Sequence, residues 1–554
     1  MKIKCLFLCL FLSASLDSGY LFAQRPTDAT DASERSGQKT SNLSVNAAAA
    51  VRSSPFDPPE DSDHSFSVDA GPGLDTGCSF RSDGPLVFNI EIKRYVGELN
   101  PDGTLRDAAA LIAAGVISPK VKLFMPGFDV DSNANIPGIA PERDRISLNG
   151  EPIGFLDGEN NQWVLNSFEV DVRKIKFASR GSNGSEPVGG VNQIRIDIDT
   201  ANTQEAWCTS VDWGVGSFRA MSPIILIHGN NSTGAFFATQ GFTAGLDARK
   251  LVYDNSINMA SGGGAFIASN ANDLNGRIPA IVRSYGAKTV HLVVHSKGGL
   301  DSRAYLANFQ RRHQDEFKVI SLTTLATPHN GSVLADLSIE RLEASQQVGY
   351  TGSILYEGFP DYTRQLLAIS QVMGIDDGRR NLTTGFVAGF NNRNLSRLDG
   401  LGVTFNTVTG DADLNSNGRI DRTPDEYAAL RTESGLLRNA PDRTATFIVD
   451  SLYQILRKTR GVSVAYRDQC VTRFGPCRKI ATVRSIDNAG LLGNDTLVTI
   501  PSGLGVGSIR SRTSNSQTFT GANGRNHSSI ANRGIAQTVI PWLIDVDRRK
   551  GGLR

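Results

Sequence analysis

The 554-residue sequence has almost no net charge, few cysteines and no long apolar segment beyond its first residues. Its 57 basic and 56 acidic residues leave a net charge of +1, so no overall field favours nucleic acid or an anionic membrane surface as a partner. The lack of a later apolar run excludes a transmembrane helix there. The composition, 40% hydrophobic and 20% charged, is typical of a globular protein, and the length predicts two or three domains.

The N-terminal residues have the order of a secretory signal peptide. Lys2 and Lys4 precede an apolar run over residues 5–16 that is too short to span a bilayer. We predict a signal peptide over 1–23 and an exported protein, secreted or periplasmic, without a transmembrane segment. Residues 24–74 are rich in Ser, Thr, Asp, Ala and Pro, which predicts a disordered leader or linker.

Four of the six cysteines lie outside the predicted signal peptide. Four cysteines allow three disulfide pairings, and their spacing is not that of a metal site. Cys470 and Cys477 lie close together around a Gly-Pro pair, which favours a local loop. Cys78 and Cys208 would then bracket one domain. An oxidising compartment favours these disulfides over four free thiols.

Residues 75–219 predict a β-sandwich-like domain. Short segments with alternating polar and apolar residues recur there, separated by Gly, Asn, Asp and Pro. Asp129, Asp131, Glu142 and Asp144 carry the oxygen ligands that calcium requires. Solvated loop acids are the favoured interpretation, because spacing alone does not show that the four converge.

Residues 220–554 show a different pattern. The continuous apolar strand at 224–227 is typical of a sheet covered on both faces. Further strands alternate with helical segments such as 274–285, which predicts a mostly parallel α/β sheet. An insertion over about 332–402 contains broken amphipathic helices and is a candidate lid, with a purely structural excursion as the alternative.

The most informative stretch is a valine-rich strand that stops at Ser296. Two glycines and a helix-forming segment follow, so Ser296 is expected on a sharp strand-to-helix turn, where its hydroxyl can reach a base and a substrate. The backbone N–H of Lys297 opens the helix, and that of Asn230 follows an early strand in the same region. Both N–H groups are candidates for an oxyanion hole.

A base and an orienting acid lie downstream. Asp495 follows an apolar segment, and His527 precedes the last predicted helix. His527 is the only histidine after His329, so a late base has one possible identity. The order Ser, Asp, His is the order that α/β serine hydrolases use. Asp487 and Asp450 remain alternatives for the acid.

Several motifs occur in an order that resembles secreted bacterial lipases of the α/β-hydrolase fold. The resemblance covers roughly residues 223–543 and is carried by Ile227-His228-Gly229, His295-Ser296-Lys297-Gly298-Gly299-Leu300, Ala326-Thr327-Pro328-His329-Asn330-Gly331-Ser332, residues 405–410, Asn494-Asp495 with Leu497-Val498, and Asn526-His527.

The resemblance implies an α/β-hydrolase fold with a lid. It assigns Ser296 as nucleophile, Asp495 as orienting acid and His527 as base, with oxyanion donors at Asn230 and Lys297. The chain also departs from the family pattern at two positions. A valine, residue 294, stands where the turn before the nucleophile usually has a small residue, and a threonine, residue 496, replaces a glycine that is common after the acid.

A calcium-binding loop is predicted after the strand that ends near residue 409. Its oxygen ligands alternate around Gly418 as at the front of an EF-hand-type loop. Pro424 stands where the twelfth position expects an acid, with Asp425 and Glu426 beside it. The predicted structural calcium ligands are Asp413, Asn415, Asn417, Arg419 through its backbone carbonyl, and Asp421. The alternative is an Asn- and Gly-rich surface turn.

These features predict an exported, lipase-like serine ester hydrolase that cleaves lipid esters through an acyl-enzyme. Its partners would be a lipid or other ester substrate and, transiently, a lipid surface; the oligomeric state stays open. The rival hypothesis is an inactive hydrolase scaffold that serves surface binding or adhesion. The large β-rich region and Val294 motivate that alternative.

Overall fold

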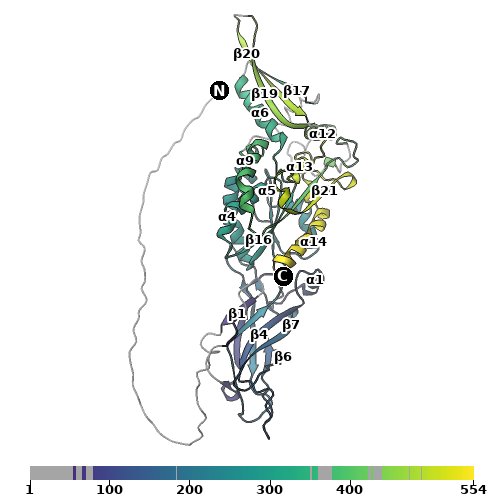
Figure 1. Cartoon of the computed structure of the whole chain (residues 1–554). Coiled ribbons are helices and arrows are strands. Elements are labelled where there is room, and N and C mark those ends of the chain that lie inside the picture. The colour runs from purple at the N-terminus through teal and green to yellow at the C-terminus, as the bar shows by residue number, and fades with distance from the viewer. Residues whose placement is uncertain are drawn as a thin grey trace, which may run out of the picture. The chain divides into compact units, whose positions relative to one another are not determined.

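The structure is a computed structural model in which residues Ala50–Arg554 form one compact unit (Figure 1). The predicted signal peptide and nearly all of the leader lie outside the described residues. The structure describes residues 54–57, 65–69, 79–182, 184–349, 352–359, 377–421, 426–427, 440–472, 475–487 and 490–554.

The β-rich region is built mainly of two antiparallel sheets, beside a short two-stranded pair. Leu123 and Met125 of one sheet and Ile146 and Ile194 of the other belong to the same buried hydrophobic cluster. The first sheet has the order β1 (Ser65–Asp69), β12 (Trp213–Ser217), β4 (Lys120–Phe128), β11 (Cys208–Val211) and β2 (Ser79–Phe80), with β7 (Trp163–Asp171) also paired to β4; the second has the order β3 (Leu86–Glu91), β10 (Val191–Asp197), β5 (Arg145–Leu148) and β6 (Glu151–Phe155).

The acidic residues of this region are not all solvated. Glu142 and Asp144 are fully buried, and Asp131 is nearly so. The interpretation of these residues as solvated loop acids is therefore wrong for Glu142 and Asp144. The pairing of β5 with β10 places the segment just before β5 against the segment just after β10, a juxtaposition that residue spacing does not reveal.

A six-stranded parallel sheet forms the centre of the α/β region. One face packs in a cluster with Val539 and Leu543 of the last helix, and the other packs with Leu274 and Leu300 of two earlier helices. The strand order is β14 (Tyr253–Asp254), β13 (Ile224–Ile227), β15 (Thr289–His295), β16 (Lys318–Leu325), β18 (Thr404–Gly410) and β21 (Thr513–Phe519).

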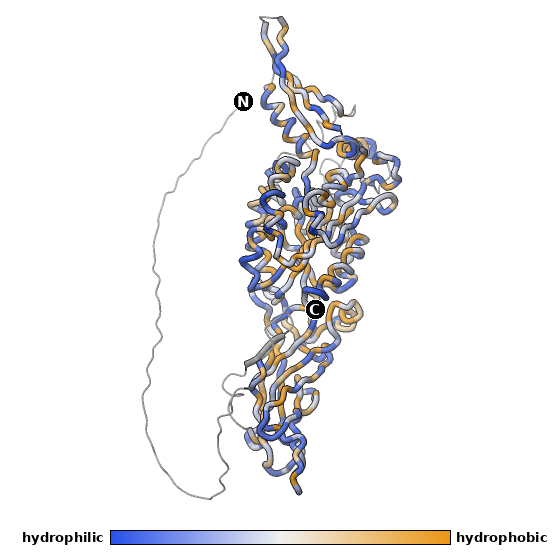
Figure 2. Tube along the Cα trace, in the orientation of Figure 1, coloured by the Kyte–Doolittle hydropathy of each residue, from blue (hydrophilic) through white to orange (hydrophobic). Residues whose placement is uncertain are grey.

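The helices of this region follow the strands as the alternating pattern predicts, and coverage on both faces explains why β15 is buried along its whole length. No helix among the described residues is long and apolar enough to cross a membrane, and Figure 2 shows apolar and polar residues interspersed along the chain. The main helices are α3 (Phe242–Asp247), α4 (Ile267–Tyr285), α5 (Gly298–Asn308), α8 (Asp377–Arg380), α9 (Thr384–Asn394), α13 (Ile500–Gly503) and α14 (Arg533–Lys550).

Two segments far apart in the sequence form a third packed region, which the sequence analysis did not predict. A three-stranded sheet shares a separate hydrophobic cluster with two helices, and two of its strands form a long hairpin (Figure 1). The elements are α6 (Val333–Val348), β17 (Ser353–Glu357), α12 (Asp442–Lys458), β19 (Thr459–Cys470) and β20 (Cys477–Asp487). The predicted insertion over 332–402 contributes α6 and β17 here; residues 360–376 of it lie outside the described residues.

The cysteines agree with the predicted pairing as far as they are described. Cys470 and Cys477 form a disulfide at the end of the β19–β20 hairpin, where the two residues are register partners. Cys208 is also disulfide-bonded. Its predicted partner, Cys78, lies outside the described residues.

Candidate active site

Ser296 lies on the sharp turn between β15 and α5. Its φ of 53° is left-handed, a conformation that is uncommon for a residue other than glycine and is found at functional turns. A Cβ at Gly298 would collide with the carbonyl oxygen of His228, so glycine permits this close approach. Val294 is fully buried in a hydrophobic cluster with Ile227. The turn therefore forms with valine at the position where a small residue is usual.

Ser296, His527 and Asp495 form a continuous hydrogen-bonded chain. His527 Nε2 lies 2.9 Å from Ser296 Oγ, and His527 Nδ1 lies 3.0 Å from Asp495 Oδ2. All three residues are buried. The other carboxylate oxygen of Asp495 accepts the N–H groups of Leu497 (2.9 Å) and Val498 (2.7 Å). These bonds fix the carboxylate, and the carboxylate in turn fixes the imidazole.

The two alternative acids lie elsewhere. Asp450, on α12, accepts the backbone N–H of Ile420 at 2.8 Å, and Asp487 is exposed at the end of β20. The structure therefore brings Asp495, rather than either alternative, to His527. Thr496, next in the chain, has φ of 84°, which explains why a glycine suits this position.

The candidate oxyanion residues flank the serine. Lys297 precedes the first residue of α5, so its backbone N–H belongs to the helix N-terminus, which favours negative charge. Asn230 follows Gly229, and a Cβ added at Gly229 would lie 2.6 Å from Ser296 Cβ. The loop after β13 is therefore packed directly against the nucleophile candidate.

A buried ion pair that the sequence analysis missed anchors Lys297. Its ammonium Nζ donates to Asp301 at 2.8 Å, and both side chains are fully inaccessible to solvent. Asn270 on α4 donates to the same carboxylate at 3.0 Å. Burial raises the pKa of Asp301 to about 6, against the lowering effect of the lysine. The sequence offered one signal for this ion pair, the i,i+4 spacing of Lys297 and Asp301 at the start of a helix.

The histidines around the triad have structural hydrogen bonds. His295 Nε2 lies 2.8 Å from the backbone carbonyl of His527, and its ring stacks on Phe236 at 4.2 Å between centroids. Burial holds the pKa of His295 well below its usual value, so the ring is neutral. His329 contacts Arg303 and Thr324. His228 Nε2 accepts the backbone N–H of Met259 at 3.0 Å.

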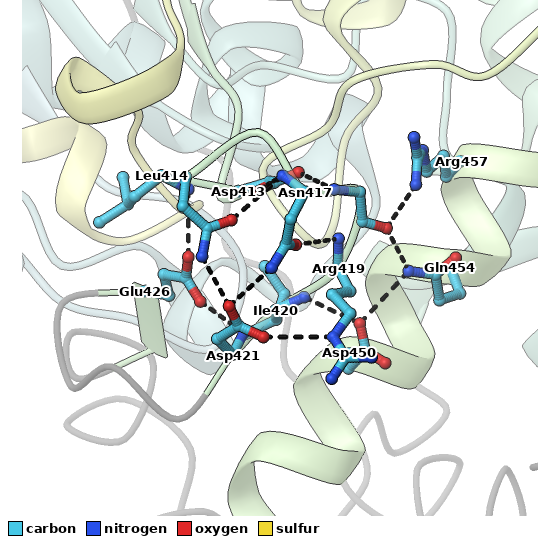
Figure 3. Close-up of polar contacts among 12 residues, drawn as sticks. Asp413, Leu414, Asn417, Arg419, Ile420, Asp421, Glu426, Asp450, Gln454 and Arg457 are labelled. Atoms are coloured by element: carbon cyan, nitrogen blue, oxygen red, sulfur yellow. Dashed lines mark hydrogen bonds and ion pairs between the residues drawn. The ribbon is translucent and has the colours of Figure 1, made fainter.

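The predicted calcium loop closes on itself through hydrogen bonds (Figure 3). Asp413 accepts two backbone N–H groups of the loop at 3.2 and 2.6 Å. Asp421 accepts the side-chain amides of Asn415 and Asn417 at 2.6 and 2.7 Å. Glu426, almost fully buried, accepts two further loop N–H groups. The side-chain atoms that could coordinate a cation here are all oxygens, which fits a hard ion such as calcium.

The charged residues of this loop also interact with one another. The Arg419 guanidinium lies 3.2 Å from Asp421, while the ligand predicted from Arg419 is its backbone carbonyl. In the described part of the chain, no group of three or more His, Cys, Asp and Glu side chains is arranged to hold a metal ion. The calcium ion stays a prediction.

Known proteins similar in sequence to this chain include triacylglycerol lipases. Those of Pseudarthrobacter phenanthrenivorans and Burkholderia plantarii are each 29% identical over 196 residues, which is 34% of this chain and 58% and 52% of theirs. Triacylglycerol lipase 2 of Saccharomyces cerevisiae is 42% identical over 55 residues, 10% of this chain and 16% of the yeast protein. The chain thus spans about half or less of the curated relatives it matches. No protein-family model matches it.

Solved structures give weaker likenesses. Bacillus licheniformis lipase BlEst2 in its mature form has a TM-score of 0.33 at 18% identity, covering 58% of this chain and 92% of that one. Phospholipase PlaB from Legionella pneumophila has a TM-score of 0.22 at 15% identity, covering 37% and 40%. These scores are low, so the fold is assigned from the structure itself. The assignment rests on the order of the parallel strands and on the strand-turn-helix at Ser296. Together with the sequence similarity, these features show that the chain contains a region with a lipase-like α/β-hydrolase fold.

Proposed function

We propose that this protein is a serine ester hydrolase that cleaves lipid esters through an acyl-enzyme. The single observation that carries the proposal is the buried chain of hydrogen bonds from Ser296 through His527 to Asp495. A serine hydroxyl is a weak nucleophile, and a hydrogen-bonded base that is itself oriented by an acid is the arrangement that activates it.

The geometry gives each residue a step. Ser296 Oγ attacks the ester carbonyl carbon while His527 Nε2 accepts its proton, and the carbonyl electron pair becomes an oxyanion facing the N–H groups of Lys297 and Asn230. His527 then returns the proton to the departing alcohol oxygen. Water, deprotonated by His527, releases the acid and regenerates Ser296. Asp495 keeps the proton of His527 on Nδ1 and stabilises the imidazolium.

The substrate and the setting of the enzyme belong to the same proposal. Sequence similarity to triacylglycerol lipases supports long-chain lipid esters as substrates. The Cys470–Cys477 disulfide and the signal-like N-terminus support an extracellular or periplasmic enzyme. The two antiparallel sheets with one shared core support a β-sandwich in the β-rich region. The insertion over 332–402 is the segment proposed to act as a lid.

The deciding experiment is active-site labelling. A fluorophosphonate probe should label the wild-type protein and the control Ser82→Ala, whose serine is exposed in the β-rich region, but not Ser296→Ala. Hydrolysis of nitrophenyl esters should follow the same pattern and should persist as the acyl chain lengthens. An inert, folded wild-type protein would sink the proposal and favour the adhesion scaffold; turnover of acetate esters alone would retain the hydrolase and reject the lipid substrate.

We also propose that the loop over 413–421 binds a structural calcium ion. A chelator should then lower the melting temperature of wild-type protein, and Asp413→Asn should reduce that sensitivity, because Asp413 supplies the first ligand position. Chelator sensitivity that is the same in wild type and Asp413→Asn would count against an ion at this loop.

A further inference from the structure

Three acidic side chains are buried together at one end of the β-rich region. Glu142, Asp144 and Asp199 are each 0% exposed. Asp144 precedes β5 and Asp199 follows β10, two strands that pair antiparallel. The backbone N–H of Asp199 donates to Asp144 Oδ1 at 2.9 Å, and the N–H of Asp131 donates to Glu142 Oε2 at 2.7 Å. One oxygen of each of these two carboxylates is thus satisfied by the backbone.

Among the described residues, the second oxygen of each carboxylate has no hydrogen-bond partner. Within the described residues, Oε1 of Glu142, Oδ2 of Asp144 and Oδ2 of Asp199 are buried without a hydrogen bond. None of the three is ion-paired there. The two neighbouring arginines interact with other residues. Arg143 lies over the Phe155 ring, and Arg145 forms an ion pair with Asp197. A buried carboxylate without a counter-charge costs several kcal/mol, so this cluster needs a positive partner.

Two kinds of partner would relieve the cluster. The first is a proton shared between Glu142 and Asp144; burial and the neighbouring Asp144 carboxylate raise the pKa of Glu142, and burial raises the pKa of Asp144. The second is a cation. Buried carboxylate oxygens that have no hydrogen bond among the described residues match the preference of calcium, which takes six to eight oxygens from carboxylates, backbone carbonyls and water.

We propose that Glu142 and Asp144 are the carboxylate ligands of a calcium-type divalent cation in the β-rich region, with Asp199 adding negative charge beside it. Two carboxylates completed by carbonyls and water are compatible with the lack, among the described residues, of three side chains already set in metal-binding geometry. The cation would hold the segment before β5 to the segment after β10. Its role is structural, and it is independent of the proposed ester hydrolysis.

A lanthanide probe can report on this site separately from the loop over 413–421. The Trp207 indole N–H donates to the Ala140 carbonyl at 2.9 Å, two residues before Glu142. Terbium replaces calcium at oxygen sites, and its emission is sensitised by a nearby indole. Full-length protein stripped with chelator should show terbium emission on tryptophan excitation, and calcium should displace it. Trp207→Phe should lose the emission yet retain the calcium-induced rise in melting temperature.

Matched variants decide the assignment. Glu142→Gln should lose the emission and weaken calcium binding by about tenfold or more, whereas Glu159→Gln, an exposed acid of the same region, should retain both. Asp413→Asn should keep the Trp207-dependent emission. If Glu142→Gln does not fold, Asp144→Asn and calorimetric calcium titration of wild-type protein replace it. Wild-type protein with neither emission nor a calcium-dependent melting shift, or unchanged emission in Glu142→Gln, overturns the proposal in favour of the shared proton.

Discussion

Replacing Gly229 with alanine tests the active-site geometry most directly. Gly229 has no unusual φ that alanine could not adopt, so the effect of the substitution is steric. The new Cβ would lie 2.6 Å from Ser296 Cβ, and 3.1 Å from both Ser296 Oγ and the His295 carbonyl oxygen. Ordinary carbon–carbon contacts are about 3.5–4.0 Å. The serine or the Gly229 loop must therefore move by roughly 1 Å.

The size of the expected effect follows from that displacement. The hydrogen bond of 2.9 Å between Ser296 and His527 cannot survive a shift of this size in its present geometry. A misplacement of about 1 Å in a reacting group can cost roughly 100-fold in rate, which corresponds to about 2.7 kcal/mol in the activation barrier. Overpacking should also lower the free energy of unfolding by about 1–3 kcal/mol.

The assay is kcat for a nitrophenyl ester, normalised to the fraction of protein that circular dichroism shows to be folded. The matched control is Gly276→Ala on the exposed face of α4, where an added Cβ meets nothing within 4 Å. It should leave kcat unchanged and stabilise the helix by about 0.5–1 kcal/mol. If folded Gly229→Ala retained the wild-type kcat, the contact between the loop after β13 and Ser296 would be refuted.

Three further predictions follow from buried groups. Thr496→Gly should raise the melting temperature, because a threonine at φ of 84°, whose buried hydroxyl has no hydrogen-bond partner in the described part of the chain, is strained by about 1–3 kcal/mol. A lower melting temperature would contradict that strain. Lys297→Met should lower the free energy of unfolding by about 3–5 kcal/mol, because it leaves the Asp301 carboxylate buried without its ion-pair partner. Adding Asp301→Leu should recover part of this loss in denaturant titrations. A double variant as unstable as Lys297→Met would argue against charge as the cause. His329 is buried, with its pKa held well below the usual value, so the folded state stays unprotonated while the unfolded state binds a proton below about pH 6.5. Stability should therefore fall with acidification by about 1.4 kcal/mol per pH unit from this residue, and urea midpoints at pH 7 and 5.5 should show a smaller loss for His329→Gln than for wild type.

The candidate site was predictable because its signals are local or ordered along the chain. A strand, a turn with glycines and a helix define the surroundings of Ser296 within a dozen residues. The acid and base follow in the order that the parallel sheet imposes, and one late histidine leaves a single choice for the base. Val294 did not prevent the turn, since its side chain packs into the core on one side of the sheet.

The parts that were not predicted depend on contacts between distant residues. Every residue in the outer half of β19 is exposed, so this half has no buried face to impose the apolar alternation that signals a strand. Its sheet is completed by β17, more than a hundred positions earlier. The acidic cluster likewise needs Asp199 next to Asp144, 55 positions away. Such pairings are set by tertiary register, which single-residue preferences do not encode.

The hydrogen bond between His527 and Ser296 joins residues 231 positions apart. Closing so long a segment is entropically unfavourable until the intervening strands have assembled. During refolding, secondary structure and the central sheet should thus return before the proposed esterase activity does. The return of ester turnover would report the final docking of the C-terminal segment. The delay between the return of secondary structure and the return of turnover would measure the lifetime of a structured intermediate that is still inactive.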